Sequence, residues 1–305
     1  MRQASIGIRD FLAELLAFES GIDLRRHRWY RECFDEPVMD YFHVERCGRI
    51  KRDRRSGEPV RARLSIRQYF ESIGVAHLYD PADPDSLVAM QYASINPWGF
   101  VGFQFGEAAL IDLGYYTPRR VRVKTERGEV EAPSYYVAGT AHGDWRNGRR
   151  RLLLLERGGE PVVLATDCNR WEGSFTGRDG LNSFEDLRRE PAQSAIIMRL
   201  IRQNLAAIEA AVGEEGTSLR ELCRGRVTLS GAIAAAHLTG AAAVARYLLG
   251  GGSAQDEAGT TLESYIDRFG GFDVAEDLAA IDDCAISLSS ASSLSSASAA
   301  SLAHK

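Results

Sequence analysis

The chain has 305 residues, of which 45% are hydrophobic and 26% are charged, a composition that is ordinary for one large or two modest globular domains. Its formal net charge of −5 argues against nucleic acid as the main partner, because binding dominated by phosphates needs a basic face. No stretch approaches the length of apolar sequence that spans a bilayer, so we expect no membrane span.

The first predicted element is an amphipathic helix over residues 7–20 that ends near Gly21. Its apolar stripe comprises Ile8, Phe11, Leu12, Leu15 and Leu16. This N-terminal stretch lacks the sustained apolar core and the small-residue cleavage site of a secretory signal. We therefore expect no cleavable signal peptide, and any export of the protein would use another route.

Residues 31–90 are interpreted as an insertion that contains a short helix at "SIRQYFESI" and a turn at "DPADPDS". Between Glu45 and Arg67 this segment carries nine arginines and lysines against three acids. An exposed, solvated loop is the favoured interpretation, and docking of an anionic polymer is the alternative.

The five cysteines are scattered and include no CxxC pair, so the sequence predicts neither a zinc site nor a redox site. They are Cys33, Cys47, Cys168, Cys223 and Cys284. We interpret them as free thiols, with a bridge between Cys33 and Cys47 as the alternative. No cofactor is predicted.

The run "NPWGFVGFQFGEAALIDLGYY", residues 96–116, combines glycines, aromatic side chains and an amide. Gly99 and Gly102 permit close backbone approach, and Gln104 offers both a donor and an acceptor among aromatic faces, a combination that binds sugars. Plain core packing is the alternative for its phenylalanines. From Ala108 to Tyr116 we expect a structural helix closed by Gly114.

A β-rich insertion over residues 119–168 follows, since its sequence alternates and turns at "ERG" and "RGGEP" as hairpins do. Helices are predicted again in "SFEDLRREPAQSAIIMRLIRQNLAAIEAAV", "LSGAIAAAHLTGAAAVARYLLGG" and "TTLESYIDRFGG". The first of these has Ser183 as its N-cap and Asp186 at the capping-box position. Residues 273–305 are predicted to be a flexible tail, acidic and then rich in serine and alanine.

Glu19, in "AFESG" at the end of the first helix, is the candidate for acid chemistry. A glutamate partly buried against Phe18 has a raised carboxyl pKa, which a general acid working near neutral pH needs. A solvated glutamate at a helix end is the alternative for this residue taken alone.

Four elements in this order resemble the lysozyme-like superfamily, in particular its branch of soluble lytic transglycosylases and phage or effector muramidases. They are Glu19-Ser20, the glycine-rich run from Gly99 to Phe105, the pattern from Ala236 to Gly240, and Tyr265 on a later helix. The segment "WEGSFTGRDGLNS" also resembles members in which it precedes a packing helix rich in glutamine. The resemblance covers residues 1–30, 91–118 and 169–272. The predicted helices indicate a mainly α (α+β) fold. The resemblance implies one lysozyme-like catalytic domain over residues 1–272 that carries a long loop insertion, 31–90, and a β-rich insertion, 119–168.

The resemblance further implies cleavage of the β-1,4 bond between N-acetylmuramic acid and N-acetylglucosamine in peptidoglycan glycan strands, with Glu19 as the general acid. Ser20, Gln104 and Tyr265 would orient Glu19 or the substrate's N-acetyl group. Substrate-binding positions would be Tyr92, Asn96, Trp98 and Gly102, although Trp98 is equally compatible with packing. The candidates for a second carboxylate are Asp23, Glu107 and Asp112, and substrate-assisted cleavage to a 1,6-anhydro product is the alternative to hydrolysis.

Two other functions stay open at this stage: a noncatalytic interaction protein on a lysozyme-like scaffold, and a glycosidase that acts on chitin or chitosan. A peptidoglycan enzyme without a cleavable signal would reach the periplasm or the wall by phage release, by injection as an antibacterial effector, or through an uncleaved C-terminal signal. A secretion or immunity partner would accompany some of these routes.

Overall fold

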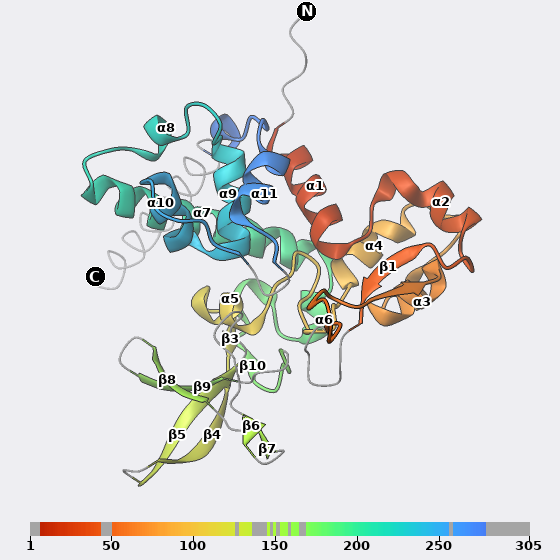
Figure 1. Cartoon of the computed structure of the whole chain (residues 1–305), viewed down its shortest axis with the longest axis horizontal. Coiled ribbons are helices and arrows are strands. Elements are labelled where there is room, and N and C mark those ends of the chain that lie inside the picture. The colour runs from red at the N-terminus through yellow and green to blue at the C-terminus, as the bar shows by residue number, and fades with distance from the viewer. Residues whose placement is uncertain are drawn as a thin grey trace, which may run out of the picture. The chain divides into compact units, whose positions relative to one another are not determined.

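The computed structural model of the chain describes residues 7–43, 51–125, 128–135, 145–146, 149–150, 153–157, 160–164, 169–255 and 259–278. These residues form helices and a few small sheets, so the prediction of a mainly α, α+β fold is confirmed (Figure 1). The chain divides into two compact units. Among the described residues, unit 1 holds 7–14, 207–253 and 262–278, and unit 2 holds 15–206 and 254–261.

Unit 1 is helical and is built around one buried helix. Its helices are α8 (Leu219–Leu222), α9 (Leu229–Thr239), α10 (Ala241–Leu248) and α11 (Leu262–Phe269), with the start of α1 (Ile8–Ser20) and the end of α7 (Glu190–Glu214). All residues of α9 from 230 to 236 are buried. Phe11 of α1 packs edge-on against Phe269 of α11, with 6.2 Å between ring centroids. Gly231 lets α9 and α11 lie close together, because an added Cβ there would lie 2.8 Å from the carbonyl oxygen of Ile266 on α11.

Two predictions in unit 1 need adjustment. The single helix predicted over 229–251 is broken at Gly240, where φ is +82°, and continues as α10. Part of the predicted tail is packed, because Val274 and Leu278 are buried and the Asp277 carboxylate accepts a hydrogen bond from the Ile8 backbone N–H at 2.9 Å. The rest of the predicted tail lies outside the described residues.

Unit 2 contains the remaining helices and a large apolar cluster. The helices are η1 (Leu24–Arg26), α2 (His27–Glu32), α3 (Ile66–Ser72), η2 (Ala76–Leu78), α4 (Ser86–Ala93), α5 (Glu107–Asp112), η3 (Arg178–Gly180) and α6 (Phe184–Leu187), with the end of α1 and the start of α7. Seven of the ten buried residues in the cluster come from the segment 31–90, among them Tyr69, Phe70 and Met90. This segment therefore supplies core as well as surface.

The strands of unit 2 form small sheets. They are β1 (Met39–Phe42), β2 (Arg61–Leu64), β3 (Tyr116–Thr117), β4 (Arg119–Thr125), β5 (Gly128–Tyr135), β6 (Trp145–Arg146), β7 (Arg149–Arg150), β8 (Leu153–Arg157), β9 (Glu160–Leu164) and β10 (Ser174–Phe175). The largest sheet has the order β4-β5-β9-β8, in which β5 and β9 run parallel and the other neighbours antiparallel. The β-rich character predicted for 119–168 is confirmed, and the tips of both predicted hairpins lie outside the described residues.

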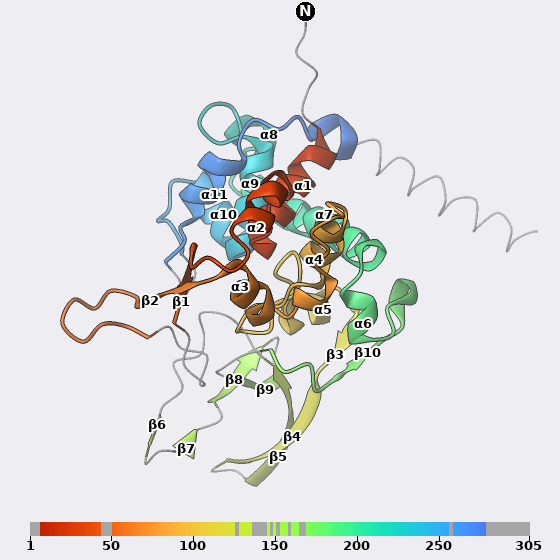
Figure 2. The same cartoon turned by 90° about the vertical axis from the view of Figure 1, so that its right-hand side faces the viewer.

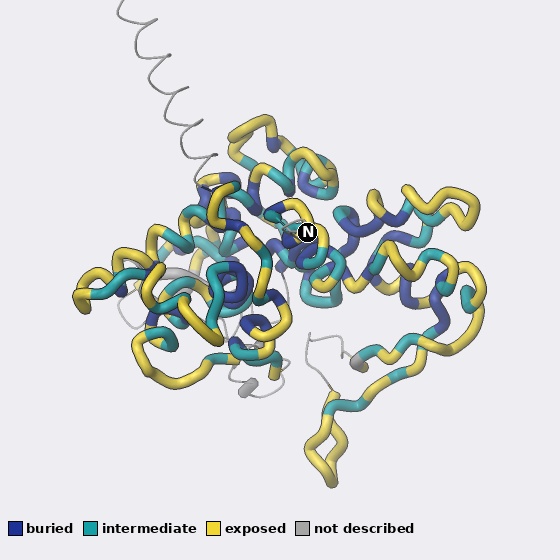
Figure 3. Tube along the Cα trace, turned by 90° about the horizontal axis from the view of Figure 1, so that it is seen from above, coloured by how far each residue is buried: buried dark blue, intermediate teal, exposed yellow. Residues whose placement is uncertain are grey.

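The basic segment forms part of an antiparallel ribbon made by β1 and β2, in which Met39 pairs with Leu64. Residues 51–58 are all exposed, and Asp53 closes their turn by accepting from the backbone N–H groups of Arg55 and Ser56 at 2.9 Å each. Figure 2 shows this loop projecting from the ribbon, and Figure 3 shows that exposure concentrates in such loops while the helices carry the buried positions. A solvated loop, the favoured interpretation, fits this exposure.

The helix predicted over 108–116 is shorter than expected. It begins at Glu107 and ends at Asp112, and Gly114 follows with φ of +75°. A left-handed residue at this position ends a helix. Tyr116 therefore lies in strand β3, where it pairs with Phe175. The predicted stop at Gly114 is confirmed, and the helical assignment of the two tyrosines after it is wrong.

The predicted cap at Ser183 is confirmed, and so are the predicted free thiols that lie within the described residues. The Ser183 hydroxyl accepts from the backbone N–H of Asp186 and begins α6, as expected. Cys33 and Cys223 are free thiols, while the other three cysteines, Cys47 among them, lie outside the described residues. None of the described helices combines the length and the apolar character needed to cross a membrane.

Candidate functional site

The C-terminal end of α1, which carries Glu19, is held by side chains from two other helices of unit 2. The chain leaves α1 through Gly21. The hydroxyl of Tyr69 on α3 donates to the carbonyl of Gly21 at 3.2 Å, and the amide of Gln91 on α4 donates to the carbonyl of Ile22 at 2.7 Å. Gly21 and Ile22 follow the last residue of α1, so these buried side chains satisfy carbonyls of the turn and fix the turn after Glu19.

Removing the Tyr69 hydroxyl is expected to loosen this turn. In Tyr69→Phe the part-buried hydrogen bond to the Gly21 carbonyl is lost, so we expect the free energy of unfolding to fall by about 1 kcal/mol. Urea denaturation followed by circular dichroism measures the change. Tyr247→Phe, at a half-buried tyrosine on α10, is the control and should cost less than about 0.5 kcal/mol. Equal transition midpoints for the wild type and Tyr69→Phe would show that the hydroxyl does not hold the turn.

Three predicted site residues are linked by consecutive hydrogen bonds. Nε2 of Gln104 donates to the carbonyl of Glu19 at 2.7 Å, and Oε1 of Gln104 accepts from Nδ2 of Asn96 at 2.5 Å. Gln104 has φ of +61°, which is unusual for a residue with a Cβ. This backbone conformation costs about 1–3 kcal/mol, and it persists only where surrounding contacts offset the cost. The structure thus brings Glu19, Asn96 and Gln104 together although 85 positions separate the first from the last.

Asn96 also shapes the loop in which it lies. Its Oδ1 accepts from the backbone N–H groups of Trp98 and Phe100 at 2.9 and 3.1 Å. Both ends of the Asn96 amide are therefore used within the protein, and Trp98 is half-buried. A direct contact of either residue with sugar stays a prediction. Ser20 is buried, and its hydroxyl accepts from the Ile22 N–H, so it contributes to the turn after α1.

The loop is anchored from behind by a buried glutamine on α7. Gln193 accepts from the backbone N–H of Phe103 at 3.1 Å and donates to the carbonyls of Tyr92 and Leu187 at 2.6 and 2.7 Å. A Cβ built on Gly102 would lie 1.9 Å from Oε1 of Gln193. Gly102 therefore lets the loop approach α7, and its predicted contact with sugar stays a prediction.

The segment from Asn169 to Trp171 clamps the other side of the same run. Nδ2 of Asn169 donates to the carbonyl of Trp98 at 3.0 Å, and its Oδ1 accepts from the Glu107 N–H at 2.8 Å. The indole N–H of Trp171 donates to the carbonyl of Gly99 at 2.8 Å. The motif that begins at Trp171 is thus a structural partner of the glycine-rich run.

Glu107, one of the candidate second carboxylates, is only 3% exposed. Its Oε1 accepts from the backbone N–H of Arg170 at 3.2 Å and from that of Trp171. Burial, together with the charge of Glu107, raises the pKa of the neighbouring Tyr116, whose hydroxyl accepts from the Gly173 N–H. Glu107 therefore holds the clamping segment in place.

The other two candidate carboxylates lie in different surroundings. Asp23 caps η1 and accepts from the Arg25 guanidinium at 2.8 Å, and this hydrogen bond holds the pKa of the Asp23 carboxyl below its usual range. Asp112 is exposed at the end of α5, away from the buried side that carries Glu107, as helical phase predicts.

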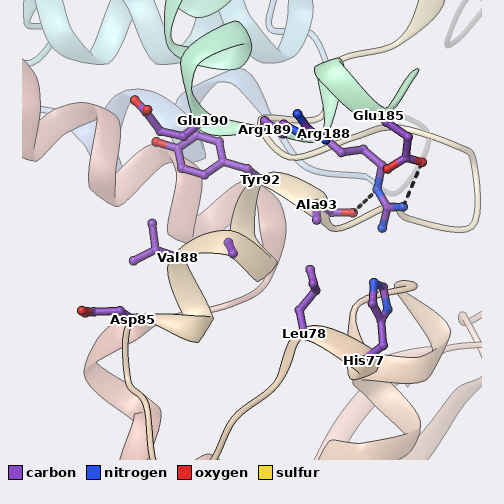
Figure 4. Close-up of a pocket in the computed structure, with 11 residues that line it drawn as sticks. His77, Leu78, Asp85, Val88, Tyr92, Ala93, Glu185, Arg188, Arg189 and Glu190 are labelled. Carbon is purple, nitrogen blue, oxygen red and sulfur yellow. Dashed lines mark hydrogen bonds and ion pairs between the residues drawn. The ribbon is translucent and has the colours of Figure 1, made fainter. Parts of the chain in front are cut away.

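Tyr92 lines a cavity of about 610 Å³ between α4, η2 and the segment that joins α6 to α7 (Figure 4). Burial raises the pKa of its hydroxyl. Glu19 and Gln104 are not among the lining residues. This cavity therefore does not bring Tyr92, the predicted sugar-binding residue, together with Glu19, the predicted acid.

Tyr265, predicted to orient Glu19, lies on α11 in unit 1, where it is buried and packs against Phe269 with 5.4 Å between ring centroids. Its predicted action on Glu19, a residue of unit 2, stays a prediction. In the described ranges no three histidine, cysteine, aspartate or glutamate side chains are grouped so as to hold a metal ion.

Sequence reasoning missed the buried polar residues that hold the loop and the helix end, namely Tyr69, Gln91, Asn169 and Gln193. Most of their partners are backbone groups more than sixty positions away, which no local pattern reveals. One signal was present for Gln193, since the resemblance includes a glutamine-bearing helix after the motif at Trp171.

In comparisons with known proteins, no family model, no curated protein and no solved structure matches the chain.

Proposed function

We propose that the chain is a glycosidase that cleaves the β-1,4 bond between N-acetylmuramic acid and N-acetylglucosamine in peptidoglycan, with Glu19 as the general acid. The observation that carries the proposal is the hydrogen-bonded link from Glu19 through Gln104 to Asn96. Residues picked from two separate motifs of the lysozyme-like pattern meet in unit 2. A left-handed Gln104 held at both ends of its amide is the kind of strained, over-determined residue that gathers at functional sites.

Cleavage of the glycosidic bond needs a carboxyl group that first donates a proton and then accepts one. Protonated Glu19 donates its proton to the glycosidic oxygen, and the bond from C1 to that oxygen breaks through an oxocarbenium-like transition state. The carboxylate of Glu19 then takes a proton from the attacking hydroxyl. If that hydroxyl belongs to water, a reducing sugar forms; if it is the 6-hydroxyl of the same muramic acid residue, a 1,6-anhydro sugar forms. Either route leaves Glu19 protonated again.

Gln104 is a positioning residue in this scheme. It contacts the backbone of Glu19 and fixes where the last turn of α1 presents the carboxyl group. Misplacement of a catalytic group by about 1 Å costs on the order of 100-fold in rate. The bonds from Tyr69 and Gln91 to the following carbonyls serve the same end.

The surroundings of the three candidate carboxylates favour assistance by the substrate. Glu107 is buried and engaged by backbone N–H groups, Asp112 lies on the exposed side of α5, and Asp23 is paired with Arg25. We therefore propose that the N-acetyl group of the muramic acid stabilises the developing positive charge, and that the 1,6-anhydro product dominates.

The proposal is tested by incubating the full-length protein with purified sacculi and identifying the soluble products by mass spectrometry. Disaccharide peptides with 1,6-anhydro or reducing muramic acid ends are the expected result. A profile identical to that of the buffer control, at protein concentrations up to the micromolar range, would overturn the proposal. In a parallel incubation with chitin, soluble oligosaccharides released while the sacculi stay intact would show that the chain acts on chitin instead.

A further inference from the structure

The antiparallel ribbon of β1 and β2 continues beyond its strands as an ordered hairpin. We call residues 39–43 and 51–64 the basic ribbon. At its tip the backbone N–H of Asp53 donates to the carbonyl of Glu58 at 2.8 Å, and the N–H of Gly57 donates to the carbonyl of Asp53 at 2.9 Å. The side chains of the tip are therefore carried on a turn that backbone hydrogen bonds define, and Figure 2 shows this turn projecting.

Positive charge is concentrated on the basic ribbon. Its cations are Lys51, Arg52, Arg54, Arg55, Arg61 and Arg63, and its acids are Asp40, Asp53 and Glu58. With six cations and three acids the basic ribbon carries +3, in a chain whose formal net charge is −5, so the other residues together carry −8. An anionic partner is therefore attracted to the basic ribbon and repelled by the net charge of the remaining residues.

Three cations at the tip are available to a partner. Lys51, Arg54 and Arg55 are exposed, and in the described part of the chain their side chains make no ion pair. The nearest acid in sequence, Asp53, is engaged by its own turn, because hydrogen bonds from the backbone N–H groups of Ser56 and Arg55 hold the pKa of its carboxyl below the usual range. The tip thus presents ordered cations that the protein itself does not neutralise.

The composition of the tip decides among the classes of anionic partner. Residues 51–58 contain no apolar side chain. A protein interface needs aromatic or apolar anchors at its centre, and a helix or loop that enters a bilayer surface needs them too. Duplex nucleic acid needs a broad basic face, whereas the residues outside the basic ribbon carry a net negative charge. A thin, linear polyanion needs neither, because a short run of exposed cations can bind successive phosphates along it.

We infer that the tip of the basic ribbon binds a linear polymer of phosphodiesters. Lys51, Arg54 and Arg55 each meet one phosphate, and each guanidinium can pair with two oxygens of its phosphate at once. Release of the counterions condensed on the polymer supplies much of the binding free energy, so binding is salt-dependent. The inference does not depend on Glu19 or on glycosidase activity.

The test is titration of the full-length protein with poly(glycerol phosphate) at several salt concentrations, followed by calorimetry. With three cations engaged, the logarithm of the association constant should fall with the logarithm of the salt concentration with a slope of about −2. The double variant Arg54→Gln/Arg55→Gln should reduce that slope to about −0.7. It should also weaken binding on the order of 25-fold at low salt, since each exposed cation contributes roughly a factor of five near an anionic surface.

The matched control is Arg220→Gln/Arg224→Gln, at exposed positions of unit 1, which changes the net charge of the chain by the same amount. It should bind the polymer as the wild type does, with the same slope. Both double variants should unfold at the thermal midpoint of the wild type, because the substituted side chains are exposed.

Three results would overturn the inference: no binding of the polymer by the wild type at low salt, equal weakening in the two double variants, or tighter binding of duplex DNA or of phosphatidylglycerol vesicles that Arg54→Gln/Arg55→Gln abolishes. The last result would assign the tip to a nucleic acid or to a membrane instead. Glu19→Gln should bind the polymer as the wild type does. Failure of this inference and failure of the proposed function are therefore seen in separate measurements.

Discussion

Glu19→Gln is expected to reduce the release of muropeptides from sacculi by about 10²–10⁴-fold, the contribution typical of a positioned acid and base. The amide of glutamine cannot give a proton to the glycosidic oxygen or take one from the attacking hydroxyl. Because Gln104 binds the backbone carbonyl at position 19, the link to the loop should survive the substitution. The thermal midpoint of unfolding should therefore change little.

The matched control is Glu36→Gln, at an exposed glutamate of unit 2. Initial rates of soluble muropeptide release, measured for wild type and both variants at equal concentration, give the comparison. Full activity in Glu19→Gln would reject Glu19 as the acid even if peptidoglycan cleavage itself is established. Equal loss in both variants would point to a general effect of the charge change.

Gly102→Ala is expected to lower the free energy of unfolding by about 3 kcal/mol or more. Two costs combine at this position. The left-handed backbone, with φ of +54°, costs an L-residue about 1–2 kcal/mol, and the new Cβ would lie 1.9 Å from Oε1 of Gln193. Gln193 is fully buried and makes three hydrogen bonds, so it cannot move aside without losing some of them.

Gly180→Ala separates the two costs. Gly180 also has a left-handed φ, +81°, but a Cβ there meets no atom within 4 Å. Urea denaturation should show a loss of about 1–2 kcal/mol for this control, which isolates the backbone term. If Gly102→Ala is no more destabilising than Gly180→Ala, the close approach of the loop to Gln193 is absent in solution.

The elements that sequence predicted well are those set by local chemistry. The helix that ends at Ser20, the cap at Ser183 and the helix stop at Gly114 each depend on neighbouring residues and were recognisable from them. The pairings in the β-rich segment follow from alternation along each strand. The two tyrosines after Gly114 were misassigned because their apolar character fits either structure, and the glycine decides.

The candidate site was predictable only in part. The motifs singled out Glu19 and Gln104, Asn96 was a predicted substrate-binding residue, and the structure joins the three. Their supports could not be predicted, since Gln193 and Asn169 act on backbone groups that the fold brings from distant positions. Tyr92 illustrates the reverse case, because the resemblance implied a sugar contact for it, whereas it lines a cavity that does not include Glu19.

The measurement that tests the central claim most directly is cleavage of uncrosslinked, peptide-bearing glycan strands in water enriched in ¹⁸O. The account predicts new muramic acid ends, mainly 1,6-anhydro ends without the label, with any reducing ends carrying one ¹⁸O atom. Both kinds of end should be lost together in Glu19→Gln. Strands that stay intact, or that are cut only in their peptides, would contradict the claim that this chain is a glycosidase.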